Sequence, residues 1–405
     1  MLWSPRARLV GLLVAAGIQN VAYTILIPFV PILQGQFHMT ALAIGLAFAG
    51  FTATKAVAQP FGGWLVDRFD ARLAGAAGLA LAALATGGLA LATSGQHIVG
   101  LRLLWGLGEG LAIPAIYRLV SQLGDDATLG ATKAMGWFGS AAVLGMTAGP
   151  GLVAIFSSVL TFHRAFLLGS ALTLASAILL TFVTRPSARS APSPDVPSTP
   201  KPVGLSSLLL VVGVGFLDLI NNFIYAAIEP ILPLYGHNRL GVDQRSISTL
   251  FFIGLLLFAL ASPVGGMIAN RIPTLKLTAA ALLIQLVALC LPAIIPDLSA
   301  LAIGFLALMT AQPLVYVALR STLTQLRNAN QGATFGWFGL ISDLGWVLGP
   351  LIMTGLLDTL NNVTFAVLAA LAMIGAVLAW TINGRLAAQA IHDKQPSLAP
   401  SFPSH

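Results

Sequence analysis

Residues 18 to 33 read IQNVAYTILIPFVPIL, and residues 220 to 235 read INNFIYAAIEPILPLY, so one pattern occurs twice in this chain. The residues that recur are Asn20 with Asn222, Tyr23 with Tyr225, Pro28 with Pro230 and Pro31 with Pro233. Both stretches are largely apolar, and they lie about 200 residues apart in a chain of 405 residues. This arrangement indicates a duplicated unit.

Further matches keep nearly the same offset along the chain. PFGGWLVDR at 60–68 matches PVGGMIANR at 263–271, and GWFG occurs at 136–139 and again at 336–339. Tyr117 is the counterpart of Tyr316 in the same alignment. The sequence therefore predicts two copies of one structural unit.

The composition identifies the lipid bilayer as the main solvent. The chain is 57% hydrophobic and 8% charged, with a mean hydropathy of +0.90, whereas soluble domains carry about 25% charged residues. Apolar stretches of roughly 20 residues, long enough to cross about 30 Å of hydrocarbon, recur throughout. We therefore predict an all-α integral membrane protein with twelve transmembrane helices. They cover approximately residues 9–33, 41–65, 73–93, 98–118, 135–157, 163–183, 205–233, 247–269, 277–296, 299–320, 335–357 and 363–383.

Six of these helices precede, and six follow, a segment rich in Pro and Ser. We predict a six-helix bundle over residues 1–184, a cytoplasmic linker over 185–203, a second six-helix bundle over 204–385 and a cytoplasmic tail over 386–405. Two pseudo-symmetric bundles around a site near the bilayer midplane are typical of transporters that rock between two states.

The positive residues predict the orientation. Of the 20 Lys and Arg residues, 15 fall on the side of the two termini, among them Arg320, and three fall on the other side. Because short cytoplasmic loops carry the positive excess, we expect a multi-pass protein of the bacterial cytoplasmic (inner) membrane with both termini in the cytoplasm.

Composition also limits partners and cofactors. The net charge of +7 is not gathered on a soluble basic face, so we expect no nucleic-acid partner. Cys290 is the single cysteine, which excludes an intramolecular disulfide, and the six histidines form no metal-spaced pair. We expect a monomer in the bilayer, a small-molecule substrate and protons as partners, and neither a metal nor a cofactor.

The segment after the second predicted helix resembles the loop signature of the major facilitator superfamily, and the resemblance covers nearly the whole chain. Gly63, Asp67, Arg68 and Arg72 match it, while Asp70 stands where the family usually has glycine. Asp67 is placed to cap the N-terminus of the eleventh helix and so to latch the bundles on the inner side. The alternative is a solvated, positive-inside loop.

The fourth predicted helix is also similar to a signature of that superfamily. Arg102, Gly106 and Gly108 match it, with Trp105 in place of the usual glutamine. Glu109 lies seven residues after Arg102, on the same helix face about two turns away. A buried arginine needs a partner or a watery cavity. Alternatively, Arg102 is an anchor at the outer headgroup level.

A Gly-x-x-x-Gly-Pro motif in the fifth helix is similar to one associated with the drug:proton antiporter branch. Its residues are Gly145, Gly149 and Pro150, with a second copy at Gly345, Gly349 and Pro350. Small residues four apart let two helices approach closely, and proline bends a helix, so we expect the motif to seal one side of the cavity. The second copy fits equally well with a packing element inherited by both halves.

Embedded acids are the candidates for proton coupling. Asp218, Asn222, Tyr225 and Glu229 form one polar stripe on the seventh helix, and Asp343 lies within the eleventh. An acid at membrane depth is costly to ionise and is therefore suited to binding and releasing a proton. The proton-coupling candidates are Asp218, Glu229, Asp343 and Glu109. The alternatives are an outer-surface position for Glu229 and purely structural hydrogen bonds for Asp218 and Asp343.

The remaining candidates concern the substrate. We expect a cavity lined by the first, fourth, seventh and tenth helices, and Lys55 either faces this cavity or pairs with an acid. The candidate cavity residues are Asn20, Tyr23, Arg102, Asn222, Tyr225, Tyr117 and Tyr316.

The predicted function is secondary active transport by alternating access. Because no nucleotide-binding loop is present, we expect proton coupling, and the family resemblance favours an antiporter that carries out multidrug efflux of lipophilic or amphipathic small molecules. Uptake or flipping of a lipid-like molecule, sugar or other metabolite is the alternative within transport. An intramembrane enzyme or a receptor is the alternative of another class, and no catalytic cluster in the sequence supports it.

Overall fold

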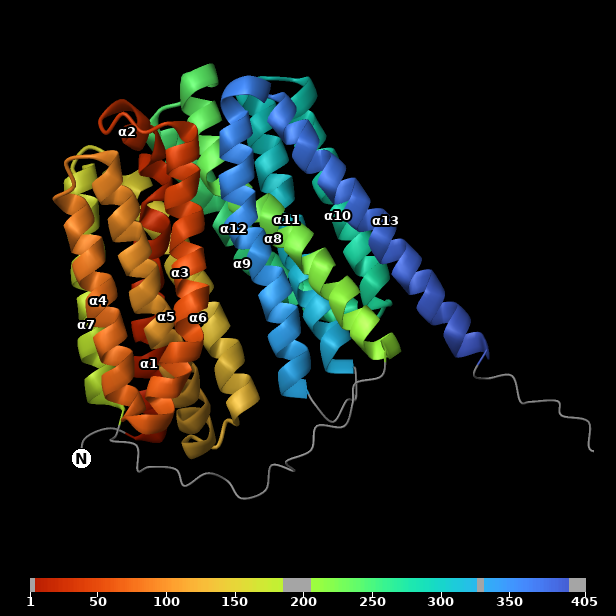
Figure 1. Ribbon diagram of the computed structural model, residues 1–405, viewed down its shortest axis with the longest axis horizontal. Helices are drawn as coiled ribbons and strands as arrows, with labels where there is room; N and C mark the ends of the chain where they lie inside the picture. The colour runs from red at the N-terminus through yellow and green to blue at the C-terminus, as the bar shows by residue number, and fades with distance from the viewer. Residues whose placement is uncertain (1–3, 185–204, 326–330, 393–405) are drawn as a thin grey trace, which may run out of the picture.

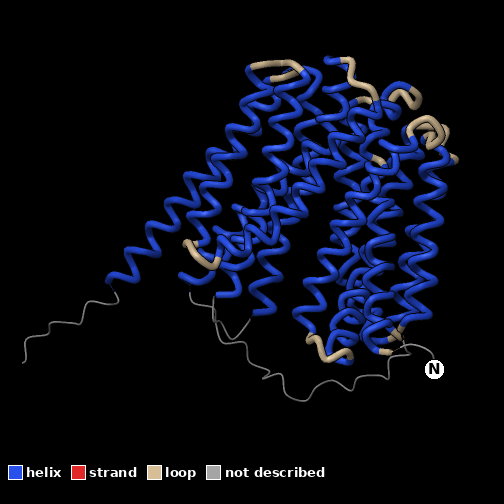
Figure 2. Tube along the Cα trace, turned by 180° about the vertical axis from the view of Figure 1, so that it is seen from behind, coloured by secondary structure: helices blue, strands red, loops and turns tan. Residues whose placement is uncertain are grey.

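The computed structural model describes residues 4–184, 205–325 and 331–392, and all regular structure in these ranges is helical (Figures 1 and 2). Twelve helical segments in this part are long and apolar enough to cross a membrane. The predicted all-α, twelve-helix architecture is therefore confirmed. The predicted linker at 185–203 and the end of the predicted tail lie outside the described residues.

The helices of the first half alternate in direction across the molecule (Figure 1). They are α1 (Pro5–Ile25), η1 (Ile27–Phe29), α2 (Val30–Gly35), α3 (Ala41–Arg68), α4 (Ala71–Ala90), α5 (Gly95–Asp126), α6 (Ala131–Phe156) and α7 (Phe162–Val183). Those of the second half are α8 (Leu205–Leu240), α9 (Gln244–Ala269), α10 (Thr274–Ile294), α11 (Leu298–Gln325), α12 (Gln331–Leu360) and α13 (Val363–His392).

Side-chain caps define where several of these helices begin. Thr40 accepts a hydrogen bond from the Ala43 amide at the start of α3, and Ser94 accepts one from His97 at the start of α5. Asp243 does the same at the start of α9, where hydrogen bonds from the side chain and backbone of Ser246 hold the pKa of the Asp243 carboxyl below its usual range. These caps satisfy amides that would otherwise lack partners at the helix ends.

The duplicated prolines act differently in the two halves. Around Pro28 the first span breaks into α1, a short 3-10 turn and α2. Pro230 and Pro233, in contrast, lie inside the continuous helix α8. Proline removes a backbone donor, and neighbouring packing decides whether the helix bends or breaks. The first span thus has an irregular segment that its copy lacks.

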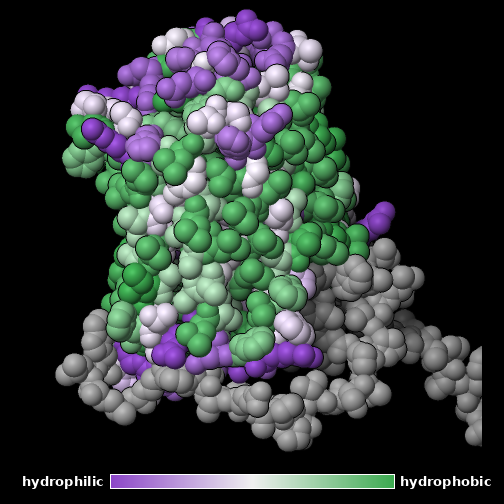
Figure 3. All heavy atoms as spheres, turned by 60° about the vertical axis from the view of Figure 1, so that its left-hand side comes forward, coloured by the Kyte–Doolittle hydropathy of each residue, from purple (hydrophilic) through white to green (hydrophobic). Residues whose placement is uncertain are grey.

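Apolar side chains cover the sides of the molecule. Figure 3 shows a hydrophobic belt around the middle, with hydrophilic residues gathered at the two ends. Large apolar residues such as Leu84 (73% exposed) and Phe182 (81% exposed) lie on this outer surface. Such a belt fits a protein embedded in the hydrocarbon of a bilayer.

Helices α1 to α7 pack mainly with one another, and α8 to α13 do the same (Figure 1). We call the end at which α1 begins and α7 ends the termini face, and the other end the opposite face. Between the two bundles, α3 packs against α12 and α6 against α9. Asn238 joins the bundles near the opposite face, donating a hydrogen bond of 2.6 Å to Gln34. The two bundles diverge toward the termini face (Figure 1).

Both copies of the Gly-x-x-x-Gly-Pro motif lie at equivalent helix contacts. A Cβ atom added at Gly145 would collide with the backbone of Gly17, so α6 lies directly against α1. A Cβ atom at Gly345 would collide with the carbonyl of Leu219, so α12 lies directly against α8. Gly149 and Gly349 continue the same contacts one turn further along. The close helix approach expected from the motif is present in both bundles.

Replacing Gly145 with valine is expected to destabilise the folded protein without touching any charged group. The added side chain has no room against Gly17, and overpacking of this kind costs about 1–3 kcal/mol. Thermal unfolding in detergent measures the loss. Gly139 is the matched control on the same helix, because an added Cβ there meets no atom within 4 Å. Equal losses at both positions would contradict the packing role.

Candidate functional site

A cavity of about 240 Å³ lies between the two bundles, near the middle of the helices. The first bundle contributes Tyr23 from α1, Lys55 from α3 and Glu109 from α5, and the second contributes Asp343 and Trp346 from α12. Of the four spans expected to line the cavity, the first and the fourth contribute residues to it, whereas its lining includes no residue of α8 or α11, the seventh and tenth spans.

The cavity opens toward the termini face. Side chains on its approach are well exposed, including Tyr117 (44%), Tyr316 (43%) and Leu340 (60%). Toward the opposite face the bundles are in contact, as at Gly45 of α3, where an added Cβ atom would collide with Thr354 of α12. The structure is therefore open on one side of the cavity and closed on the other.

Lys55 and Glu109 form an ion pair on one wall of the cavity. The distance from Lys55 Nζ to Glu109 Oε2 is 3.3 Å, and the side chains are 28% and 6% exposed. Trp105 donates a hydrogen bond of 3.0 Å from Nε1 to Glu109 Oε1. The expected pairing of Lys55 with an acid is thus observed, and Trp105 has a defined polar role at the position where the family signature has glutamine.

Arg102 is completely buried, so the alternative of an anchor at the headgroup level is wrong. Its Nε donates to the carbonyl of Ala47 at 3.2 Å, and its guanidinium lies over the rings of Phe51 (4.4 Å) and Trp105 (4.9 Å). Nη1 and Nη2 have no hydrogen-bond partner among the described residues. Stacking on electron-rich ring faces stabilises a buried cation, and the two free donors leave Arg102 able to bind a further acceptor.

Glu229 is also buried, at 2% exposure, so its alternative position at the outer surface is wrong. Tyr23 of α1 donates a hydrogen bond of 3.1 Å to Glu229 Oε2 on α8. This bond joins the two bundles between the cavity and the opposite face. Arg102 is close enough to act electrostatically on both groups. A carboxyl group therefore lies at the junction of the bundles with a buried cation nearby.

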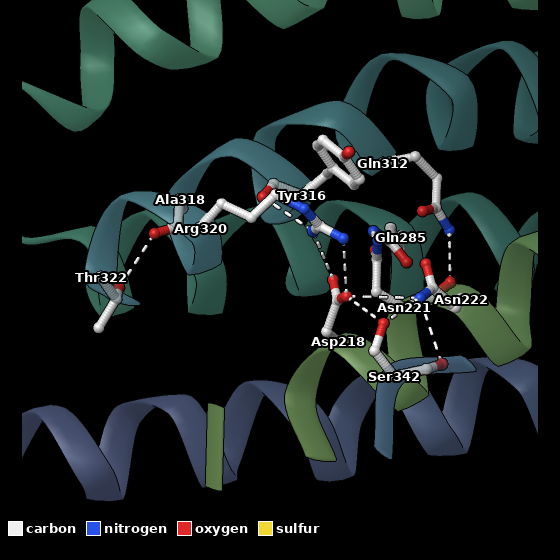
Figure 4. Close-up of polar contacts among 10 residues, drawn as sticks. All are labelled: Asp218, Asn221, Asn222, Gln285, Gln312, Tyr316, Ala318, Arg320, Thr322 and Ser342. Carbon is white, nitrogen blue, oxygen red and sulfur yellow. Dashed lines mark hydrogen bonds and ion pairs between the residues drawn. The ribbon is translucent and has the colours of Figure 1, made fainter. Parts of the chain in front are cut away.

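Asp218 is at the centre of a buried polar cluster in the second bundle (Figure 4). Arg320 donates to both carboxylate oxygens, each at 3.2 Å, and the Ser342 hydroxyl donates at 2.6 Å. Asn222 donates to Ser342 Oγ at 2.8 Å and to Asp218 at 3.4 Å. The cluster ties together α8, α11 and α12, and it satisfies a carboxylate that is fully buried.

Arg320 is the last residue of the tenth predicted span, and α11 continues beyond it to Gln325. Its guanidinium stacks on Tyr316 at 3.4 Å and pairs with Asp218. The sequence placed Arg320 on the side of the termini but did not predict this partner.

A second polar layer borders the Asp218 cluster (Figure 4). Gln285 of α10 donates to the Asn221 side chain at 2.9 Å, and Gln312 of α11 donates to the Asn221 backbone carbonyl at 3.1 Å. All three residues are buried. None of the three was among the predicted site residues, although an uncharged amide within an apolar span is a signal that the sequence contains.

Asp343 lies on the cavity wall opposite the Lys55–Glu109 pair. It forms no hydrogen bond or ion pair with the residues whose side chains the structure describes. Lys55, on the other bundle, exerts the largest electrostatic effect among the charged groups around it, followed by Asp218 and Arg320. Asp343 is therefore partly exposed, and no cation among the described side chains is bound to it.

Other candidate residues take supporting positions. Asn20 lines the cavity and donates to the Ala16 carbonyl at 2.8 Å. Tyr225 is buried and packs edge-on against Trp346, with ring centroids 5.2 Å apart. Tyr117 packs against Phe138 on the approach to the cavity.

The predicted latch residues lie at the termini face but do not join the bundles. Asp67 is 81% exposed and pairs with Arg118 of its own bundle at 3.7 Å. Arg68 stacks over Trp64, and Arg72 lies 3.7 Å from Asp70, which caps α4. The ion pair of Asp67 lies within its own bundle in this open arrangement, and the latch stays a prediction for a state in which the termini face is closed.

Two six-helix bundles around a charged central cavity that opens at one end define a membrane transporter. The chain belongs to the Major Facilitator Superfamily, whose family model matches residues 12–350 and 212–400.

Curated relatives with a similar sequence include efflux proteins. The chain is 21% identical over 369 residues to multidrug resistance protein 1 of Bacillus subtilis, covering 90% of this chain and 94% of that protein. It is 21% identical over 335 residues to quinolone resistance protein NorA of Staphylococcus aureus, covering 82% of this chain and 86% of that protein.

Solved structures with the same fold belong to transporters of several kinds. A bacterial homologue of the human lysosomal transporter Spinster, in an inward-facing conformation, has a TM-score of 0.75 at 15% identity over 98% of this chain and all of that chain. The nucleoside transporter NupG has a TM-score of 0.77 at 11% identity over 92% of this chain and 99% of that chain. These likenesses describe the fold alone.

Proposed function

We propose that this chain is a proton-coupled antiporter that exports lipophilic or amphipathic small molecules by alternating access. In this proposal the termini face is the cytoplasmic face of the bacterial inner membrane, as the distribution of Lys and Arg predicts. The structure then corresponds to the state that takes up substrate from the cytoplasm. The sequence similarity to multidrug and quinolone resistance proteins supports the direction and the substrate class.

The observation that carries the proposal is the hydrogen bond between Tyr23 and Glu229. It joins the two bundles on the closed side of the cavity, and one of its partners is a buried acid. An ionised carboxylate accepts a hydrogen bond more strongly than a neutral one. Gain or loss of a proton at Glu229 therefore changes the strength of a contact between the bundles.

The cavity walls combine apolar and polar surface, which suits an amphipathic substrate. Phe51, Met146 and Trp346 provide apolar and aromatic surface, and polar or charged side chains such as Gln59 and Asp343 lie beside them. The carboxylate of Asp343 adds a negative charge, so an amphipathic molecule with a positive group fits this cavity better than an anion.

Reconstitution into liposomes with an imposed pH gradient tests the proposal. The purified protein is expected to move lipophilic dyes against a concentration gradient only while the pH gradient persists. Amide variants at Asp218, Glu229, Asp343 and Glu109 are compared with wild type. Asp358→Asn serves as the control, because Asp358 is an exposed acid at the end of α12. Transport that is independent of the pH gradient, or unchanged in all four variants, would refute proton coupling.

A further inference from the structure

We propose that Lys55 exchanges partners during the transport cycle, pairing with Glu109 while the termini face is open and with Asp343 when that face closes. This inference rests on the proposed function and names the residues that couple closure of the cavity to uptake of a proton. Three observations on the cavity carry it.

The first observation is that Lys55 has one partner and faces a second. It is bonded to Glu109 of its own bundle at 3.3 Å. Asp343, on the other bundle, lines the same cavity and has no cation bound to it among the described residues. One ammonium group thus lies between two carboxylates, and only one of the two pairs is made.

The second observation concerns the direction of the motion. Lys55 is on α3 and Asp343 is on α12, and these two helices touch closer to the opposite face, where Gly45 lies against Thr354. The bundles diverge from that contact toward the termini face (Figure 1). Rocking about the α3–α12 contact to close the termini face therefore brings the Lys55 and Asp343 walls of the cavity together. A lysine side chain is a flexible four-carbon stem, so its ammonium group can turn from one carboxylate to another that approaches it.

The third observation is the burial of Glu109, whose side chain is only 6% exposed. The groups around it are Lys55 of α3, Tyr23 of α1, Asp343 of α12, and Arg102 and Trp105 of its own helix. Arg102 acts on Glu109 from a distance, since its guanidinium is stacked between aromatic rings. Departure of Lys55 leaves Glu109 without an ion-pair partner, and a buried carboxylate in that position binds a proton.

The charges balance with one proton for each exchange. While the termini face is open, the three side chains form the Lys55–Glu109 pair and a free Asp343 carboxylate, and their net charge is −1. After the termini face has closed, they form the Lys55–Asp343 pair and a protonated Glu109, and their net charge is zero. Reopening of the termini face returns Lys55 to Glu109 and releases the proton on that side.

Thiol labelling of the cavity measures the balance between the open and closed states without substrate or gradient. The reporter is Leu340→Cys in a Cys290→Ala background, which removes the single native cysteine. Leu340 is 60% exposed and lies three residues before Asp343, on the same face of α12. A maleimide that does not cross membranes, added at the termini face of vesicles, reacts with this thiol only while that face is open.

The two amide variants are expected to act in opposite directions. Asp343→Asn removes a pair made only in the closed state and raises the labelling rate, whereas Glu109→Gln removes a pair made only in the open state and lowers it. A partly exposed pair shifts the ratio of open to closed states by about fivefold at most. Both effects disappear in a Lys55→Met background, because the exchanging group is then absent. Asp358→Asn, on the same helix as Asp343, leaves the rate unchanged.

Changes in the same direction, or changes that persist with Lys55→Met, would overturn the exchange. Glu109→Gln is also expected to keep substrate exchange across liposomes while losing accumulation driven by a pH gradient, and retained accumulation would contradict its role as proton acceptor. A wild-type protein without any gradient-driven transport would refute the proposed function instead, and the labelling results would still decide the exchange.

Discussion

Replacing Glu229 with glutamine is expected to reduce gradient-driven transport to the rate seen without a gradient, while the protein stays folded. The amide has nearly the same shape, and its oxygen still accepts the hydrogen bond from Tyr23, so the junction between α1 and α8 is kept. What is lost is the ability to bind and release a proton at a site between the bundles. Transport of a fluorescent dye in liposomes, with and without a pH gradient, measures the difference.

Tyr23→Phe is the matched variant for this experiment. It removes the hydroxyl that binds Glu229 but keeps the ring contact with Phe51, whose centroid is 5.4 Å away. We expect Tyr23→Phe to retain gradient dependence at a reduced rate, because the acid is still present. Equal gradient dependence in wild type and Glu229→Gln would exclude Glu229 as a proton site.

Replacing Asp218 with asparagine is expected to cause the largest loss of stability among the acid variants. Asp218 is fully buried and binds Arg320, Ser342 and Asn222 at once (Figure 4). Removing one partner of a buried ion pair costs about 3–5 kcal/mol, and we expect the lower part of this range because the Arg320 side chain is 30% exposed and is partly hydrated when it is unpaired. Thermal unfolding in detergent measures the loss.

Arg320→Gln, alone and combined with Asp218→Asn, completes a double-mutant cycle. The double variant is expected to be more stable than Asp218→Asn alone, since no unpaired charge then remains in the bundle. Additive losses would mean that the two side chains do not act as a pair.

The duplication in the sequence predicted the fold for a clear physical reason. A span of about 20 apolar residues in a bilayer forms a helix, because only a helix satisfies all of its backbone hydrogen bonds within the span. The recurring glycines indicated where two helices approach each other most closely. Gly145 and Gly345 indeed lie against α1 and α8 at equivalent positions. Spacing along one helix also placed Asp218 and Asn222 on one face, where they share Ser342.

Contacts between helices distant in sequence could not be predicted in the same way. Nothing local distinguishes Glu109 from Asp343 as the partner of Lys55, because the choice depends on how the bundles are tilted. The partner of Arg320 lies 102 positions away in Asp218, and no local pattern in the sequence indicates that pair. Helix periodicity identifies the side of a helix on which a residue lies, but it does not identify which other helix packs against that side.

A distance measurement between the two bundles tests the central claim, that they rock about the closed side of the cavity in response to protons and substrate. Spin labels at Phe69→Cys and Ile272→Cys, in a Cys290→Ala background, lie at matching exposed positions beyond α3 and α9 on the termini face. Pulsed electron paramagnetic resonance in lipid nanodiscs is expected to show a long and a short distance, with populations that change with pH and with added substrate. A single distance, unchanged by pH and by every transported compound, would contradict the account.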